Sequence, residues 1–288
     1  MENAVTLNNV KKSFKDFQLD NISFSVKKGF ITGFIGPNGS GKTTTIKLMM
    51  NLISQDSGSL TMFGRDHAEH AKHLKQRIGF VYAENHFYEH LTVRQMKRVI
   101  ASFYREWDEE LFVKYMDYFA LPWKKKIKHL STGMKMKFSL ACALSHHPDL
   151  IIMDEPTSGL DPVFRRELLT ILTEVIQDEN KTIFFSTHIT SDLEQIADYI
   201  TFIHNGKIIL NDTKEALNDQ YHIVRGANER MDEDARHMFI YARETSVGFE
   251  GLTNQPEKIR RKMGQHTVLE PASLEDIMVY TTRSERYA

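Results

Sequence analysis

The strongest chemical signal in this 288-residue chain is a glycine-rich run between an apolar segment and a helical one. Glycines let backbone N–H groups turn inward around an anion, and a helix that follows adds the positive end of its dipole. The lysine of such a run reaches β- and γ-phosphates, and the hydroxyl after it binds Mg²⁺. The run consists of Gly36, Pro37, Asn38, Gly39, Ser40, Gly41, Lys42 and Thr43, followed by Thr44. It predicts a nucleotide-phosphate site.

A second signal is a pair of carboxylates directly after the apolar residues 150–153. A buried strand there would deliver Asp154 toward a metal ion, and Glu155 could orient or deprotonate an attacking water. Such a pair is common and means little alone. Combined with the glycine-rich run and the charge of Lys42, it predicts hydrolysis of a nucleoside triphosphate.

Further short motifs follow in a fixed order. Ser131 stands before a helical segment, where a serine is a natural N-cap, and the Gly133 amide beside it completes a second anion site. Asp161 closes a short run after the carboxylates, and His188 ends the next apolar segment. A lone histidine at a strand end is usually structural, so its role rests on the motif order. The motifs read Leu130-Ser131-Thr132-Gly133-Met134, Pro156-Thr157-Ser158-Gly159-Leu160-Asp161 and Thr187-His188.

The elements that position these residues alternate between strand and helix patterns, which predicts an α/β fold with parallel strands. Asn205-Gly206 is a hairpin signal. The expected strands are residues 5–7, 22–26, 30–35, 150–153, 182–186, 199–204 and 207–210, and the expected helices are residues 43–52, 135–144, 165–177 and 191–197.

Two regions depart from that alternation. Between about residues 84 and 142 glycine is almost absent and apolar residues recur at helical spacing, which predicts a helical insertion. After about residue 219 the signals weaken. Strands are expected near residues 223–224 and 238–241, and a helix near 274–280.

Composition narrows the function class. The net charge is −1, so there is no electrostatic footprint for nucleic acid. No run approaches the roughly 18 apolar residues of a membrane span, and the first residues do not resemble a secretion signal. We therefore expect membrane contact only through a partner. The single cysteine, Cys142, is expected to be a buried apolar residue.

The motif order resembles the ATP-binding subunits of ABC transporters, over about residues 3–215. The closing run at residues 271–277, Pro-Ala-Ser-Leu-Glu-Asp-Ile, resembles the exporter-type ABC-2 branch. The resemblance implies a P-loop NTPase core with an N-terminal antiparallel β subdomain and a helical insertion at about 84–145. It also implies a small C-terminal α+β extension. The expected division is an ABC ATPase domain at 1–218 and an accessory or dimerisation region at 219–288.

The same resemblance implies ATP hydrolysis with Mg²⁺ in a head-to-tail homodimer or heterodimer. Each ATP would lie between the glycine-rich run of one subunit and Ser131 and Gly133 of the other. His188 would contact the γ-phosphate, and Asp161 would act across the interface. The dimer would sit on an integral membrane permease at the cytoplasmic face of the membrane, and its cargo would be an antimicrobial or amphipathic peptide.

Aromatic residues carry two further implications of the resemblance. Adenine would stack on a ring near the N-terminus, for which Phe14 is the first candidate and Phe17 the second. The segment 85–91, with Phe87 and Tyr88, lies where the family presents a groove to its membrane partner. Packing of these rings into the helical insertion is an equally open interpretation.

Two motifs depart from the family pattern. Thr132 and Met134 replace a glycine and a glutamine of the usual Leu-Ser-Gly-Gly-Gln. A β-branched residue restricts the backbone and a thioether cannot hydrogen-bond a ribose, so ATP is expected to close the dimer less tightly. Ala83 stands where a metal-binding glutamine is usual. Either Glu84 replaces it as a Mg²⁺ ligand, or Glu84 is a solvated loop charge.

The alternative function is a soluble ABC-type ATPase that acts on nucleic acid or the ribosome. Residues 43–154 are too few for the long coiled coil of chromosome and repair members, and translation members carry two phosphate loops per chain. A P-loop kinase would not need the motif at Ser131, and no guanine-reading Asn-Lys-x-Asp sequence is present. The sequence therefore favours a transporter subunit.

Overall fold

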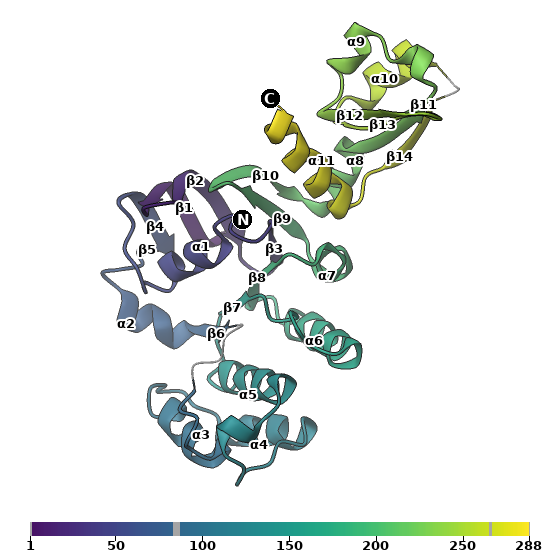
Figure 1. Ribbon diagram of the computed structural model, residues 1–288. Helices are drawn as coiled ribbons and strands as arrows, with labels where there is room; N and C mark the ends of the chain where they lie inside the picture. The colour runs from purple at the N-terminus through teal and green to yellow at the C-terminus, as the bar shows by residue number, and fades with distance from the viewer. Residues whose placement is uncertain (1, 83–86, 265–266, 288) are drawn as a thin grey trace.

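The computed structural model describes residues 2–82, 87–264 and 267–287, and this part of the chain forms three sheets (Figure 1). The central sheet has the order β10 (Lys207–Thr213), β9 (Tyr199–His204), β3 (Ile31–Ile35), β8 (Thr182–Thr187), β7 (Leu150–Asp154), β6 (Ile78–Tyr82). The N-terminal sheet has the order β2 (Gln18–Lys27), β1 (Asn3–Ser13), β4 (Ser57–Met62), β5 (Arg65–Asp66). The C-terminal sheet has the order β12 (Tyr241–Thr245), β13 (Gly248–Thr253), β11 (His222–Gly226), β14 (Val268–Pro271).

Helices lie on both sides of these sheets and between them. Their bounds are α1 Lys42–Met49, α2 Ala71–Leu74, α3 Val93–Ala101, α4 Glu109–Tyr118, α5 Thr132–Leu144, α6 Pro162–Val175, α7 Thr190–Ile196, α8 Lys214–Gln220, α9 Glu233–Arg236, α10 Pro256–Met263 and α11 Leu274–Tyr287.

The central sheet confirms the expected α/β core. Strands β3, β7 and β8 are buried at every residue, as parallel strands covered on both faces must be. Their pairing is parallel, whereas β10 pairs antiparallel with β9. The N-terminal sheet is antiparallel throughout, as expected for the β subdomain.

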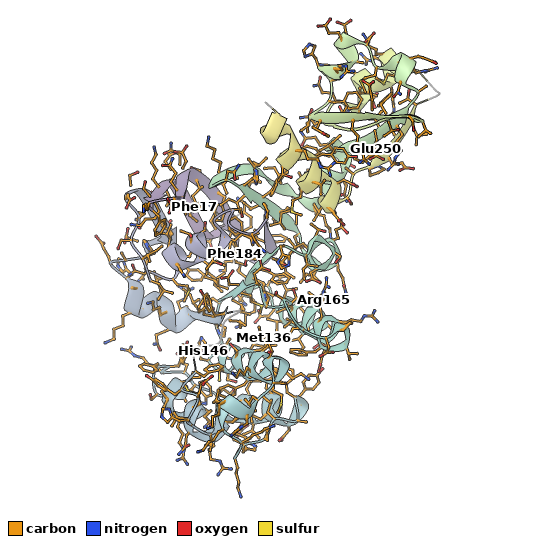
Figure 2. All side chains as sticks on the ribbon, in the orientation of Figure 1. Phe17, Met136, His146, Arg165, Phe184 and Glu250 are labelled. Atoms are coloured by element: carbon orange, nitrogen blue, oxygen red, sulfur yellow. The ribbon has the colours of Figure 1, made fainter. Side chains whose placement is uncertain are left out.

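Aromatic rings join the N-terminal sheet to the central one. Phe24 of β2 stacks on Phe34 of β3 with 5.4 Å between ring centroids, and Phe34 lies 5.2 Å from Phe184 of β8. All three rings are buried (Phe184 is labelled in Figure 2). Ring pairs of this kind stabilise a fold beyond the burial of their apolar area, so they hold the N-terminal sheet against the central sheet.

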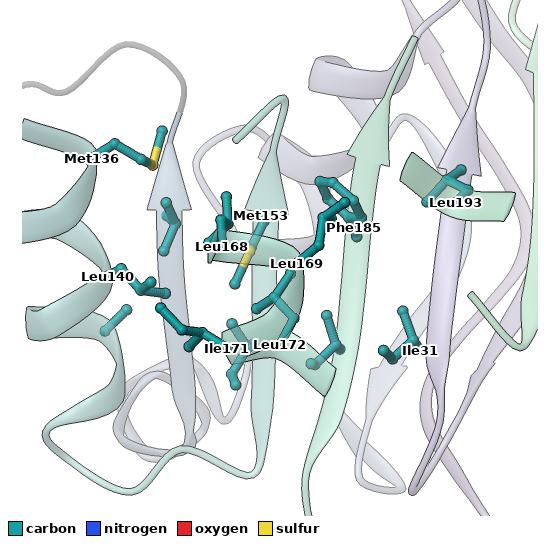
Figure 3. Close-up of a cluster of buried hydrophobic side chains, with 14 of the residues drawn as sticks. Ile31, Met136, Leu140, Met153, Leu168, Leu169, Ile171, Leu172, Phe185 and Leu193 are labelled. Atoms are coloured by element: carbon teal, nitrogen blue, oxygen red, sulfur yellow. The ribbon is translucent and has the colours of Figure 1, made fainter. Parts of the chain in front are cut away.

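The opposite face of the central sheet is covered by α5, α6 and α7 (Figure 3). Leu168, Leu169 and Leu172 of α6 pack over Met153 and Phe185 of the strands. These leucines recur at helical spacing, so one apolar stripe of α6 faces the sheet.

The expected helical insertion is confirmed, and local caps define its helices. Thr92 and Gln95 form a capping box at the start of α3, and the Asp108 carboxylate accepts from the Leu111 amide at the start of α4. The Ser131 hydroxyl caps α5 by accepting from the Met134 amide at 3.2 Å, as expected. The Cys142 thiol is buried within α5, which raises its pKa well above the ordinary value.

The C-terminal part forms its own sheet, flanked by α9 and α10 on one side and by α11 on the other (Figure 1). Residues 223–224 lie in β11 and 274–280 lie in α11, as expected. The strand expected at 238–241 is wrong for its first three residues, because β12 begins only at Tyr241. Side-chain hydrogen bonds from Tyr280 of α11 and from Arg225 lower the pKa of Glu250 to about 2. Glu250 thereby fastens α11 to this sheet.

The expected hairpin between β9 and β10 braces the glycine-rich run. The Gly206 amide donates to the Ser40 carbonyl at 3.0 Å, and the Gly206 carbonyl accepts from the Asp20 amide at 2.9 Å. Gly206 has φ +73°, and a Cβ there would lie 1.9 Å from the Gln18 carbonyl oxygen. Only glycine fits this turn.

Gly206→Ala tests that brace. We expect a loss of about 3 kcal/mol or more in the free energy of unfolding, from the left-handed backbone and the clash together, measured by urea denaturation. Gly64→Ala is the matched control, because Gly64 has φ +74° and open space around a Cβ. It should cost only about 1 kcal/mol. Equal losses would show that the contact with Gln18 does not constrain the turn.

Candidate nucleotide site

Strand register brings the chemical residues to one edge of the central sheet. Ile35, the last residue of β3, pairs with Thr187 of β8, and Asp154, the last residue of β7, pairs with Ser186. Because parallel strands end at the same edge, the loops that follow β3, β7 and β8 lie together. Ligands of open α/β sheets bind at this edge.

The glycine-rich run forms a cradle of backbone amides after β3. A Cβ at Gly36 would lie 2.2 Å from the Ile203 carbonyl oxygen, and Gly41 has φ +115°, so neither position accepts a side chain. The hydroxyl of Ser40 is buried and has no hydrogen-bond partner within the described part of the chain. Buried polar atoms are almost always paired, so this orphan fits the oxygen of a phosphate. Asn38 and Gly39 are exposed at the tip of the run.

Lys42 lies under the cradle with 6% of its side chain exposed. Its ammonium donates to the Gly36 carbonyl at 2.7 Å and lies 3.2 Å from Oε1 of Glu155. A buried ammonium needs such partners, since an unpaired charge there is costly. Lys42 is therefore a fixed positive charge at the cradle.

Glu155 joins the lysine to the histidine. Its other oxygen, Oε2, lies 2.7 Å from Nδ1 of His188 and also accepts from the His188 amide at 3.3 Å. Glu155 has φ +50°, and its amide donates to the Ser186 carbonyl at 3.0 Å, which holds this rare backbone conformation. The sequence-predicted residues Lys42, Glu155 and His188 thus form one connected cluster.

Asp154 lies beside this cluster, 2% exposed, and accepts from the Ser186 hydroxyl at 2.6 Å. Burial raises its pKa, while hydrogen bonds from Ser186 and Thr43 oppose that rise. Thr43 stands at the start of α1, directly after Lys42. A hydroxyl and a buried carboxylate in contact are hard oxygen donors, and they fit Mg²⁺.

Comparison with known proteins decides the family. The ABC transporter family matches residues 19–158. The lantibiotic transport ATP-binding protein of Streptococcus pyogenes is 36% identical over 207 residues, which cover 71% of this chain and 88% of that protein. This chain belongs to the ATP-binding subunits of ABC transporters. It is an ABC ATPase.

Other relatives extend the match. The bacitracin transport ATP-binding protein of Bacillus licheniformis is 36% identical over 193 residues, 66% of this chain and 63% of that relative's length. The Nod factor export ATP-binding protein I of Burkholderia lata is 30% identical over 299 residues, 98% of this chain and 97% of that protein. A solved structure described as the ATP binding subunit of an ABC transporter superposes with TM-score 0.67 at 26% identity, covering 75% of this chain and 92% of that one.

Three predicted site residues of the ABC ATPase lie apart from the Lys42 cluster. The side-chain hydrogen bond of Ser131 is local to the start of α5, and Gly133 is the second residue of that helix. Asp161 caps α6, because its Oδ1 accepts from the Val163 and Phe164 amides at 3.1 and 3.0 Å. Ser131 and Asp161 are exposed. Within one chain they do not touch the cradle, so any role at ATP needs a second subunit.

The departure at Thr132 causes no backbone strain. Thr132 is the first residue of α5, where any residue adopts helical angles. Met134 packs its side chain against the apolar core. Both residues thus fit the helix, and weaker closure of the dimer by ATP stays a prediction.

The aromatic candidates at the N-terminus differ in position. Phe17 lies against the cradle, since a Cβ at Gly41 would be 3.0 Å from its ring. Phe14 is 48% exposed and stacks on Phe17 with 6.5 Å between centroids. Phe17 is thus the ring nearer the cradle, and adenine stacking on Phe14 or Phe17 stays a prediction.

Two further alternatives concern the role of Glu84 and the packing of Phe87 and Tyr88. Glu84 lies outside the described residues. Phe87 packs on Phe138 of α5 with 5.0 Å between centroids, so it belongs to the helical core. Tyr88 is 58% exposed and remains available for a partner.

Ser186 is a site residue that the sequence reasoning missed. It fixes both Asp154 and the backbone of Glu155. The available signal was a serine that interrupts an apolar strand one residue before Thr187-His188. Polar residues inside buried strands usually have a fixed partner.

Asp154→Asn tests the raised pKa. A carboxyl whose folded pKa lies above its unfolded value contributes stability at low pH that is lost as pH rises through the folded pKa. The variant should therefore melt at higher temperature than the wild type near neutral pH, with the gap closing in acid, while Mg²⁺-dependent ATP binding is lost.

The control for Asp154→Asn is Asp178→Asn. A backbone hydrogen bond from Asn180 lowers the pKa of Asp178, so its charged form is favoured in the folded state. This variant should leave the melting temperature unchanged or lower at neutral pH. A lower melting temperature for Asp154→Asn at neutral pH would contradict the sign derived from burial.

Proposed function

We propose that this ABC ATPase powers a bacterial exporter, as a subunit of a head-to-tail dimer held by an integral membrane permease at the cytoplasmic face of the membrane. The observation that carries the hydrolytic role is the position of Glu155, bonded on one side to Lys42 and on the other to His188. Export is supported by the relatives, whose names assign them to bacitracin, lantibiotic and Nod factor transport.

Each residue of the cluster has a distinct task in this proposal. The backbone amides after Gly36 and the Lys42 ammonium bind the β- and γ-phosphates. Glu155 orients the attacking water and accepts its proton, and His188 holds Glu155 through Nδ1 and faces the γ-phosphate. Mg²⁺, held by Thr43 and Asp154, would neutralise phosphate charge. Thr44 follows within the first turn of α1.

The exposed anion site at Ser131 and Gly133 supports the second subunit. A serine hydroxyl and free amides at a helix N-terminus favour a phosphate. Since these groups lie apart from the cradle of their own chain, they would meet the γ-phosphate held by the other subunit. Asp161, exposed at the start of α6, would lie at the same interface. ATP would thus close the dimer, and loss of the γ-phosphate would open it.

Cargo and partner rest on the relatives and on exposed surface. Peptide transport by the bacitracin and lantibiotic relatives supports an antimicrobial or amphipathic peptide as cargo. No helix in the described ranges is long and apolar enough to cross a bilayer. We place the permease at the exposed ring of Tyr88, since an aromatic side chain suits docking of a short helix.

Glu155→Gln separates binding from turnover. The amide cannot accept the water's proton, so kcat for ATP should fall by about 100-fold or more. Loss of the ion pair frees the Lys42 ammonium, so ATP should bind as tightly as to the wild type or tighter. Phosphate release and equilibrium binding of a fluorescent ATP analogue measure the two effects. Glu174→Gln, an exposed carboxylate on α6, is the control and should match the wild type; undiminished turnover in Glu155→Gln removes Glu155 from the base role.

Affinity capture of the tagged chain from detergent-solubilised membranes of its native cells tests the exporter. One integral membrane protein should be recovered in near-equal amount and identified by mass spectrometry. Tyr88→Ser should reduce that recovery, whereas Tyr118→Ser, an equally exposed ring on α4, should not. Recovery of ribosomes or nucleic acid in place of a membrane protein would overturn the exporter and leave the ATPase assignment standing.

A further inference from the structure

A partly buried ion pair connects the two helices that follow Asp161 and His188. Nε of Arg165 donates to Oδ1 of Asp192 at 2.7 Å, and Nη2 donates to the Ser191 hydroxyl at 2.9 Å. The Asp192 side chain is only 2% exposed, and the Arg165 side chain is 31% exposed (Arg165 is labelled in Figure 2). Both residues line a surface pocket between α6 and α7.

The spacing of this pair relates it to the site. Arg165 stands four residues after Asp161 in α6, and Asp192 stands four residues after His188, in the first turn of α7. Arg165 therefore lies one helical turn beyond Asp161, and Asp192 lies in the first turn of the helix that follows His188. The pair therefore fixes the distance between the beginnings of two helices.

The first turn of α7 depends on contacts with neighbouring elements rather than on a cap of its own. Ile189 occupies the N-cap position and provides no side-chain cap. The helix has only seven residues, too few to be stable by itself. The Asp192 carboxylate and the Ser191 hydroxyl, both in the first turn, are held by the same guanidinium. Arg165 thus anchors the first turn of α7 to α6 through these two side chains.

Among the described residues, only Arg165 forms an ion pair with the Asp192 carboxylate. Oδ2 of Asp192 is buried and has no hydrogen-bond partner among the described residues. Removing the guanidinium would leave this carboxylate uncompensated, and the first turn of α7 would shift to reach water. His188 precedes that turn directly, and its hold on Glu155 depends on a 2.7 Å contact.

We propose that Arg165 is a positioning residue for ATP hydrolysis, which acts through Asp192 and α7 to hold His188 against Glu155. It touches neither nucleotide nor water. Its effect is on the geometry of the Glu155–His188 contact, and a displacement near 1 Å at a reacting group costs up to about 100-fold in rate. This inference rests on the proposed role of Glu155 and His188 in hydrolysis.

The test compares Arg165→Met, Arg165→Lys and Arg166→Met. Arg165→Met removes the charge at similar volume, and kcat should fall at least about tenfold with KM for ATP within about twofold of the wild type. Arg165→Lys restores a positive charge that reaches Asp192, but lysine lacks the forked geometry of the guanidinium. It should therefore recover only part of the lost kcat. Arg166 is the exposed neighbour on α6, and Arg166→Met should behave as the wild type.

A double-mutant cycle with His188→Ala separates positioning from general stability. If Arg165 acts through His188, Arg165→Met should lower kcat by less than about twofold once the histidine is gone. Rates are measured with radiolabelled ATP well below each variant's melting temperature. An unchanged kcat in Arg165→Met overturns the proposal, as does a loss that remains multiplicative in the His188→Ala background.

Amide hydrogen exchange gives a readout that does not depend on turnover. The peptide covering residues 186–193 should exchange faster in Arg165→Met than in the wild type or Arg166→Met, because α7 has lost its anchor. Unchanged exchange overturns the proposal. A wild-type chain that fails to hydrolyse ATP would contradict the proposed function instead, and the exchange experiment would still decide the role of Arg165.

Discussion

The parallel register of β3, β7 and β8 is the constraint on which the site depends. Ile35 pairs with Thr187 and Asp154 with Ser186, so three loops from distant parts of the sequence end at one edge. All three strands are fully buried, and a slip by one residue would turn buried side chains to the opposite face. The register is therefore fixed by the core, and the positions of Lys42 and Glu155 follow from it.

The core that fixes this register also makes the site costly to build. Lys42 and Asp154 are charged groups with almost no exposed surface, and Glu155 keeps a backbone conformation that non-glycine residues rarely adopt. These residues are paired within the site. Lys42 forms an ion pair with Glu155, and the Ser186 hydroxyl hydrogen-bonds to the Asp154 carboxylate and to the Glu155 amide. Buried charges persist only when such partners are in place. The site is thus pre-organised by electrostatics, at the expense of stability.

How far the sequence predicts this arrangement depends on whether a residue's neighbours are local. Caps such as Ser131 and the Asn205-Gly206 hairpin depend on a few adjacent residues, and both are confirmed. The α/β core follows from apolar periodicity in the same way. The sequence does not show which of the rings of Phe14 and Phe17 lies against the cradle, because this depends on how the N-terminal sheet packs.

Longer-range polar contacts carry no periodic signal. Ser186 and the pair of Arg165 with Asp192 are separated from their partners by 27 to 32 residues, and each looks like an ordinary helix or strand residue in isolation. Met238 and Phe239, the first two residues of the strand predicted at 238–241, pack against the C-terminal core around Phe249 and lie outside any strand. In each case tertiary packing decided what local pattern could not.

The helix after His188 is where these long-range contacts converge. On one side Arg165 of α6 holds Asp192. On the other side Oε1 of Glu194 accepts from the Leu274 amide at the start of α11, at 2.9 Å. Helix α11 is in turn bonded to the C-terminal sheet through Tyr280 and Glu250. The seven-residue α7 is therefore held from both sides, by α6 of the central part and by α11 of the C-terminal part.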